Sequence, residues 1–239
     1  MSEVFNTLFF GVYPYIALAV LALGSIVRYD REPYTWRSGS SQLLRRKQLI
    51  WGSVLFHVGV LAIFFGHLGG LLTPLWFWHM LGVSHAAKQM VAIVLGGVAG
   101  TIGIVGASLL IHRRFFDARV RAASSFADNA IILILWIQLA LGLLTITVSL
   151  QHRDGEEMVK FMNWAQGIFT FNGEASSYVA GAPLVFKLHI ILGLTIFVLF
   201  PFTRLVHMLS VPVRYLWRPG YQVVRQRNRH PAATRLPAE

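Results

Sequence analysis

The sequence predicts an all-α membrane protein with five transmembrane helices, and its composition carries most of that prediction. Of the 239 residues, 55% are hydrophobic and 13% are charged, whereas an ordinary soluble domain carries about 25% charged residues. A transmembrane helix needs about 20 apolar residues, so the chain has room for about five spans with short connections. Cysteine is absent, which excludes disulfides, thiolate metal sites, iron–sulfur ligation and c-type haem attachment in this chain.

Five long stretches that are uncharged or nearly so define the predicted spans. The second stretch, residues 48–87, is too long for one helix, and we end its span near Leu72 because a Thr-Pro pair and three aromatic residues follow. Lys187 and Arg204 bound the last stretch, and we extend its span past both because a basic side chain can snorkel or meet a buried anion. The predicted spans are residues 5–27, 48–72, 89–111, 129–151 and 184–209.

The basic residues are distributed unequally between the two ends of this bundle. Sixteen Lys and Arg residues lie in the first and third connections and the C-terminal tail, and three lie in the second and fourth connections. The positive-inside rule therefore predicts an N-terminus outside and a cytoplasmic C-terminus in the inner membrane. The formal net charge of +11 is then an orientation signal, not a nucleic-acid footprint. Residues 1–10 lack a basic n-region and a cleavage site, so we expect mature sequence there.

The fourth connection carries a helical pattern of its own. Asp154 and Glu157 are spaced as a capping box, and apolar residues then recur at helical spacing. We expect a short amphipathic helix on the outer interface. Its apolar positions are Met158, Phe161, Met162, Ala165, Ile168 and Phe169.

The sequence predicts that the chain has two parts. Residues 1–221 form the five-helix transmembrane domain, and residues 222–239 form a basic cytoplasmic tail. The tail reads equally well as a solvated, disordered charge run or as ordered chain, whereas residues 211–221 are richer in aromatic and apolar residues and suit docking to a cytoplasmic partner.

Four histidines fall inside predicted spans: His57 and His67 in the second, His189 and His207 in the fifth. These two spans are antiparallel, so depth pairs His57 with His207 at the cytoplasmic level and His67 with His189 at the outer level. Ten helical residues rise about 15 Å and eighteen rise about 27 Å. Tilt, unequal cofactor orientation or a kink at Pro201 has to absorb that mismatch.

Two depth-matched histidine pairs favour two bis-histidine b haems, with the four histidines as axial iron ligands. Interhelical hydrogen bonding would explain one isolated histidine, and a proton or ion pathway is the alternative of a different class. Such a pathway usually needs intramembrane carboxylates, and Asp128 is the one candidate. We expect the remaining histidines to be ordinary surface residues: His79, His85, His112, His152 and His230.

Glycines cluster near these histidines. Three lie close to His67: Gly66, Gly69 and Gly70. In the third span, Gly96 and Gly100 form a G-x-x-x-G pair, for which we favour close helix packing over haem clearance.

Over nearly its whole length the chain resembles the gamma subunit, or cytochrome b subunit, of membrane-bound respiratory nitrate reductase. The resemblance does not extend beyond about Tyr221. The matching stretches are residues 12–17 (VYPYIA), 28–30 (RYD), 34–37 (YTWR), 55–57 (LFH), 66–67 (GH), 72–74 (LTP), 140–145 (ALGLLT), 200–202 (FPF), 204–205 (RL), 207 (H) and 210–213 (SVPV).

The resemblance implies five helices, two b haems, and oxidation of menaquinol or ubiquinol at the outer face with electrons passed inward. It assigns His67 and His189 to the outer haem and His57 and His207 to the inner haem. It also implies two cytoplasmic partners, an iron–sulfur beta subunit and a molybdenum-containing alpha subunit that reduces nitrate to nitrite. This chain would hold neither of those centres. A cytochrome b subunit of another quinone-linked complex, such as a sulfur-metabolising one, stays open.

The remaining candidate residues lie near the two ends of the bundle. Lys88 matches the lysine of the family's Lys-Gln pair, here Lys88-Gln89, and the resemblance implies that it helps to bind quinol. His85 is a weaker candidate for the proton acceptor. At the cytoplasmic level, cationic side chains suit charge-assisted contacts with haem propionates. The candidates there are Arg204, Arg113 and Arg114.

Overall fold

A computed structural model of the chain describes residues 3–36 and 44–210. In those ranges five helical segments are long and apolar enough to cross a membrane, and no strand is present. The segments are Glu3–Arg31, Arg46–Leu72 (α3), His85–Phe116 (α5), Phe126–Ser149 (α7) and Leu184–Phe202. The prediction of an all-α, multi-pass membrane protein is confirmed. The predicted tail and the predicted docking segment, residues 211–239, lie outside the described ranges.

The first span contains a wide turn. It consists of α1 (Glu3–Asn6), a π-helical turn η1 (Thr7–Val12) and α2 (Tyr13–Arg31). Pro14 is fully buried just after that turn. Because proline has no N–H and its ring crowds the carbonyl four residues earlier, a regular α-turn there is disfavoured, and the wider turn makes room for the ring.

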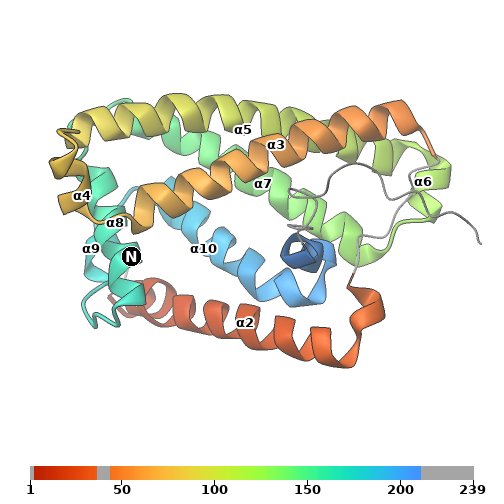
Figure 1. Cartoon of the computed structure of the whole chain (residues 1–239), viewed down its shortest axis with the longest axis horizontal. Helices are drawn as coiled ribbons and strands as arrows, with labels where there is room; N and C mark the ends of the chain where they lie inside the picture. Colours follow the sequence, from red (N-terminus) through yellow and green to blue (C-terminus); the bar gives the residue numbers. More distant parts are fainter. Residues whose placement is uncertain (1–2, 37–43, 211–239) are drawn as a thin grey trace, which may run out of the picture.

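Shorter elements close the two ends of the bundle (Figure 1). At one end lie α4 (Leu75–Met80), α8 (Glu156–Phe169) and α9 (Ser177–Ala180); at the other lie η2 (Pro33–Thr35) and α6 (Ala118–Ala122). The amphipathic helix in the fourth connection is α8, which packs on α3, α5 and α9. Its predicted capping box is wrong: Gly155, with φ at 85°, occupies the N-cap, and Asp154 instead accepts a hydrogen bond from the N–H of Glu156 at 3.1 Å.

Neighbouring spans pack in the order α3, α5, α7, α10 (Leu184–Leu199) and α2. The closest approach is between α3 and α5. A Cβ on Gly106 would lie 2.8 Å from the Cα of Phe56, and one on Gly59 would lie 2.7 Å from the carbonyl oxygen of Ala99. Glycine allows this backbone contact because it has no side chain.

The predicted packing role of the Gly96–Gly100 pair is only half right. A Cβ on Gly100 would meet Leu143 of α7, but one on Gly96 would meet nothing within 4 Å in the part of the chain that is described. The sequence motif therefore does not mark the tightest helix contact.

The fifth span is not one straight helix to residue 209, as the sequence predicted. Helix α10 ends at Leu199, a 3₁₀ turn η3 (Phe200–Phe202) follows, and Thr203 is extended before the 3₁₀ segment η4 (Arg204–Ser210). Arg28 of α2 donates hydrogen bonds to the carbonyls of Pro201 and Thr203, at 2.7 and 2.8 Å. The break therefore has its freed carbonyls satisfied, and it redirects the chain that carries His207.

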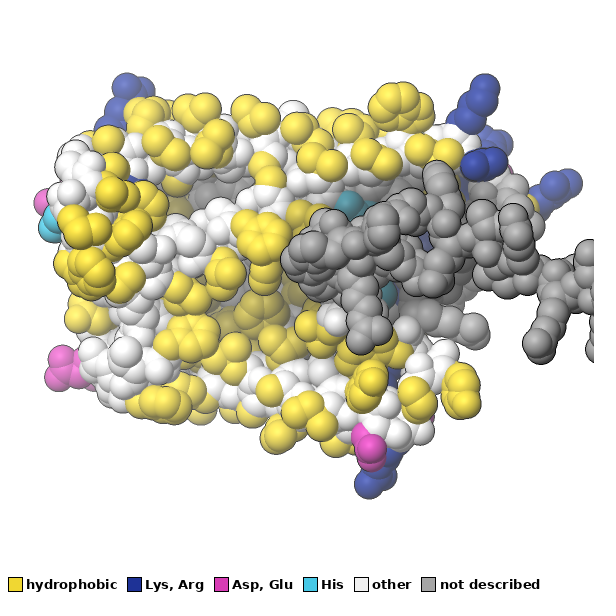
Figure 2. Space-filling view, viewed as in Figure 1, with side chains coloured by type: hydrophobic (Ala, Val, Ile, Leu, Met, Phe, Trp, Pro, Cys, Tyr) yellow, Lys and Arg dark blue, Asp and Glu magenta, His cyan; other side chains and the backbone are white. Residues whose placement is uncertain are grey.

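The surface has the polarity of a membrane protein. Figure 2 shows hydrophobic side chains along the length of the bundle and the charged side chains gathered toward its ends. Only 11% of the most apolar window of α3 is buried within the chain. This face is hollowed between the α3–α5 side and α2 (Figures 1 and 2). Much of α3 is thus free to contact lipid or a cofactor.

Candidate functional site

The structure places the four intramembrane histidines in two facing pairs. The ring centres of His57 and His207 lie 6.1 Å apart, and those of His67 and His189 lie 6.2 Å apart. Each pair joins α3 to the fifth span or to the segment that follows it. These are the two pairings that depth in antiparallel spans predicts. The break after α10 supplies the adjustment that a straight helix of eighteen residues lacks.

Three of the four rings are oriented by backbone carbonyls. The Nδ1 atom of His57 lies 2.7 Å from the carbonyl oxygen of Ser53, and that of His67 lies 2.9 Å from the carbonyl oxygen of Ile63. The Nδ1 atom of His207 contacts the carbonyl oxygen of Arg204. A histidine that binds a metal through Nε2 usually donates its other ring N–H in this way. These contacts leave Nε2 as the nitrogen available for a ligand.

His189 is held differently, by a neighbouring helix. The side-chain amide of Gln138 in α7 donates to the His189 carbonyl at 3.1 Å and lies 3.4 Å from the ring Nε2. The Nδ1 atom of His189 and the Oε1 atom of Gln138 are both buried without a hydrogen-bond partner among the described residues. A Cβ on Gly142 would lie 3.0 Å from the ring, so that glycine leaves the ring its space.

The spacing of both pairs fits a bis-histidine haem. Metal–imidazole bonds of about 2 Å, with each nitrogen about 1 Å from its ring centre, put two axial rings roughly 6 Å apart. The described residues contain no cluster of three or more His, Asp or Glu that could bind a bare metal ion. A porphyrin supplies the other four ligands itself, so two histidines suffice.

There is also room beside His67. A Cβ built on Gly66, Gly69 or Gly70 would meet nothing within 4 Å in the described ranges. The three glycines therefore leave space around His67. Glycines that serve close helix packing would instead touch another helix.

Lys88 lies at the His67 end of the bundle, in the first turn of α5. It is only 6% exposed. Its Nζ donates to the carbonyl of Gly70, one helical turn past His67, and to the Sδ of Met162, each at 2.7 Å. The same atom lies 4.7 Å from the centre of the Trp78 ring. The ammonium group is thus fixed between α3, α4 and α8 and does not snorkel to solvent.

The two residues named with Lys88 have other partners. Gln89 donates to the carbonyls of Ser149 and His152, which ties α5 to the end of α7. The His85 ring stacks on His79, and their Nε2 atoms lie 2.9 Å apart. His79 is exposed, as the sequence predicted, and it lies beside His85 at this end of the bundle.

At the opposite end, two of the three candidate arginines meet at one carboxylate. Arg204 and Arg114 lie 3.6 and 4.0 Å from the Oδ1 of Asp128. Asp128 also forms a capping box with Ser125 at the start of α7. Arg113 donates to the carbonyl of Leu44 at 2.7 Å, toward the start of α3. Asp128 thus lies beside two guanidinium groups at this end of the bundle.

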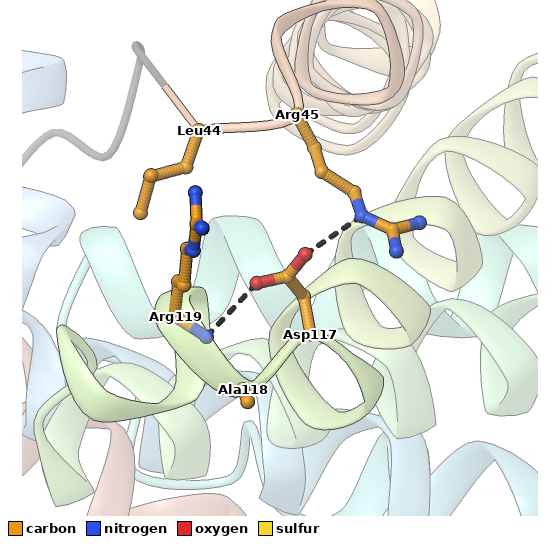
Figure 3. Close-up of a pocket in the computed structure, with 5 residues that line it drawn as sticks. All are labelled: Leu44, Arg45, Asp117, Ala118 and Arg119. Carbon is orange, nitrogen blue, oxygen red and sulfur yellow. Dashed lines mark hydrogen bonds and ion pairs between the residues drawn. The ribbon is translucent and has the colours of Figure 1, made fainter.

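A surface pocket of about 380 Å³ at this end joins the start of α3 to α6 (Figure 3). Asp117 accepts hydrogen bonds from the backbone N–H groups of Arg119 and Val120 and pairs with Arg45 at 2.7 Å. The N–H of Val120, together with Arg45, lowers the pKa of the Asp117 carboxyl. The pocket is lined by none of the four histidines, and its contacts anchor the connection between helices.

Sequence reasoning missed two residues that shape the histidine site. Gln138 is one polar residue in an apolar span, and Arg28 reads as one of several cationic residues in a basic connection. Gln138 of α7 donates a hydrogen bond to His189 of α10, and Arg28 of α2 donates one to the carbonyl of Pro201. Neither role can be recognised without knowing which helix faces are in contact.

Known proteins that resemble this chain along most of its length include nitrate reductase gamma chains. The family model for the nitrate reductase gamma subunit matches residues 6–227. The respiratory nitrate reductase 1 gamma chain of Escherichia coli is 50% identical over 93% of this chain and 98% of its own length, and the respiratory nitrate reductase 2 gamma chain of that organism is 49% identical over 95% and 100%. The nitrate reductase gamma chain of Bacillus subtilis is 37% identical over 91% and 97%. A family match over most of the chain, together with five apolar spans, makes this a multi-pass inner-membrane protein that belongs to the nitrate reductase gamma subunit family.

Proposed function

We propose that this chain is the di-haem b, quinol-oxidising membrane subunit of a respiratory nitrate reductase. The observation that carries the proposal is the geometry of two facing histidine pairs, with ring centres 6.1 and 6.2 Å apart, one toward each end of the bundle. Family membership supports the nitrate reductase assignment. In this proposal the chain is part of a quinol:nitrate oxidoreductase.

His67 and His189 would hold the outer haem, and His57 and His207 the inner one. When bound, the two haems supply one-electron transfer between the two sides of the membrane. The carbonyls of Ser53 and Ile63 engage Nδ1 of the two α3 rings, which leaves Nε2 available for the iron. Rings fixed before the cofactor binds lose little rotational freedom on binding.

The inner end supplies charge for the cofactor's carboxylates. Arg204 is three residues from His207, and it lies with Arg114 beside Asp128. A propionate at this end would gain charge-assisted hydrogen bonds from these guanidinium groups. Arg113 is the weaker candidate because it donates to the carbonyl of Leu44.

The outer end supplies groups that suit a quinol. An ammonium group has three N–H donors, and Lys88 directs one at Gly70 and one at Met162. We assign the third to a quinol oxygen. A protonated lysine cannot accept the proton that the quinol loses, whereas a neutral imidazole can. His85, three residues away in the same helix, is therefore the proton acceptor in this scheme.

The partners follow from the same proposal. A gamma chain passes electrons to other subunits, here an iron–sulfur beta subunit and a molybdenum-containing alpha subunit on the cytoplasmic side. The quinol is menaquinol or ubiquinol. The orientation comes from the positive-inside rule, with sixteen basic residues on the cytoplasmic side.

A proton or ion pathway receives less support from the structure. Its one candidate carboxylate, Asp128, caps α7 and lies beside Arg114 and Arg204. Its oxygens are thus engaged at the end of the bundle, by the N–H of Ser125 and by the two guanidinium groups, and not within the apolar part of a span.

The test uses the membrane complex as isolated. A quinol analogue, added in the absence of oxygen, should reduce the b haems, as seen in their absorbance. Nitrate should then reoxidise the haems. Reduction followed by no reoxidation with nitrate would indicate another terminal acceptor. No reduction by quinol would contradict the proposed function itself.

A further inference from the structure

The pair formed by His79 and His85 lies outside the proposed haem sites. His79 is in the last turn of α4, and His85 is the first residue of α5. Their Nε2 atoms are 2.9 Å apart while their ring centres are 5.0 Å apart. The two nitrogens therefore face each other across a gap of 2.9 Å.

The backbone around the two histidines is fixed by three elements. Gly82, with φ at 70°, turns the chain between α4 and α5, and the N–H of Val83 closes the turn on the carbonyl of Trp78. A Cβ on Gly155 would lie 2.7 Å from the Cβ of His85, so α8 begins directly against that residue. The pair is thus set by three elements, which is more than a chance contact of two surface side chains provides.

We propose that His79 and His85 form a binding site for a divalent transition-metal ion of the Cu²⁺, Ni²⁺ and Zn²⁺ class. Imidazole suits these ions. Two imidazole nitrogens in neighbouring coordination positions, on bonds of about 2 Å, lie about 2.9 Å apart. The Nε2 atoms of this pair have that spacing, and a small turn of the two rings would direct both nitrogens at one ion. His79 is exposed and His85 is partly exposed, so water can fill the remaining positions.

The charges around the pair permit a cation. Lys88 lies one turn after His85, but its ammonium group is turned to Gly70 and Met162 and is shielded by the Trp78 ring. No third His, Asp or Glu completes a cluster in the described ranges. The site is consequently one of two protein ligands, open to solvent, and it competes with protons because only neutral imidazoles bind a metal.

Resting on the proposed function, the site has a consequence for quinol oxidation. If His85 takes the quinol proton, a metal ion on its Nε2 removes that acceptor. Zn²⁺ would then slow quinol oxidation.

The test titrates Cu²⁺ into the oxidised, untagged complex and records the electron paramagnetic resonance of the copper. We expect one equivalent bound first, with hyperfine structure from two nitrogens. His79→Asn and His85→Asn should each lose that signal. His112→Asn, at the opposite end of α5, should keep it. Binding that survives in both variants, or no stoichiometric binding to the wild type, overturns the site, since the contact is then a hydrogen bond only.

A second readout separates the site from the proposed function. Zn²⁺ should inhibit quinol oxidation by the wild type and by His112→Asn, with at least a 10-fold weaker effect on His79→Asn. Metal binding without inhibition overturns the assignment of His85 as proton acceptor and leaves the metal site standing. The copper titration does not depend on quinol oxidation, so the two proposals fail separately.

Discussion

The side-chain amide of Gln138 donates a hydrogen bond to the carbonyl of His189 across the contact between α7 and α10, at 3.1 Å. Each of the other three paired histidines has its Nδ1 against a carbonyl three or four residues earlier in its own segment. His189 instead depends on a neighbouring helix: Gln138 lies 3.4 Å from its Nε2, and its Nδ1 is buried without a hydrogen-bond partner among the described residues.

Replacing Gln138 should therefore disturb one haem and spare the other. Gln138→Leu keeps the volume but removes the polar contact, and loss of a group that orients a metal ligand typically costs about 10- to 100-fold in metal affinity. We expect lower outer-haem occupancy or a shifted outer-haem midpoint potential, measured by redox titration. Gln48→Leu is the matched control, because Gln48 contacts His112, outside both pairs. Equal effects on both haems would show that Gln138 acts on the fold in general.

The histidine pairing itself is tested by single substitutions. His189→Ala should remove the outer haem, stop quinol oxidation and leave the inner haem, because the inner pair uses His57 and His207. His207→Ala should do the reverse for the haems. Protohaem per chain should fall by about half in each variant, with different bands lost from the difference spectrum. If His189→Ala removed only the inner haem, the pairing would be wrong.

Substitution of Lys88 should affect quinol more than haem. Lys88→Ala removes a charged donor, and hydrogen bonds from charged groups contribute about 1.5–3 kcal/mol. We expect kcat/KM for quinol to fall by roughly 10-fold or more with haem content intact. Lys160→Ala provides the comparison, because Lys160 is an exposed cation of α8 paired with Glu157. Unchanged quinol kinetics in Lys88→Ala would remove Lys88 from the site.

The contact between α3 and α5 makes a prediction about stability. Gly106→Ala would push a Cβ against the backbone of Leu55 and Phe56, and overpacking of this kind costs about 1–3 kcal/mol. Each kcal/mol lowers the melting temperature of a chain this size by roughly 2–4 °C. Gly96→Ala is the control, since its Cβ would meet nothing within 4 Å in the described ranges. Equal melting temperatures for the two variants would contradict the packing.

The sequence was enough to predict the number of spans, the end of α3 at Leu72 and the helical fourth connection, because hydropathy and helix-breaking residues are local signals. It was not enough to predict the break after Leu199. Pro201 indicates a kink, but the extended Thr203 depends on Arg28, which is distant in sequence. The predicted capping box at Asp154 and Glu157 failed because Gly155 adopts a left-handed turn against His85.

Of the candidate site, the sequence could predict the pairing of the four histidines, because that pairing follows from their depth in the membrane. Antiparallel spans put His57 at the level of His207 and His67 at the level of His189, and the structure has those residues facing each other. Partners on other helices were out of reach, because the rotation of α7 against α10 and of α4 against α5 is set by packing. For that reason the contacts of Gln138 with His189 and of His79 with His85 are known only from the structure. The N-outside orientation stays a prediction from charge.

The central claim is that the two histidine pairs hold two b haems. The most direct measurement is a dithionite-reduced minus oxidised spectrum of the purified chain or complex, with protohaem counted as the pyridine haemochrome. The account predicts two protohaems per chain, one lost with His189→Ala and the other with His207→Ala. No protohaem after expression with adequate haem supply would contradict the account, and so would full haem content in both variants.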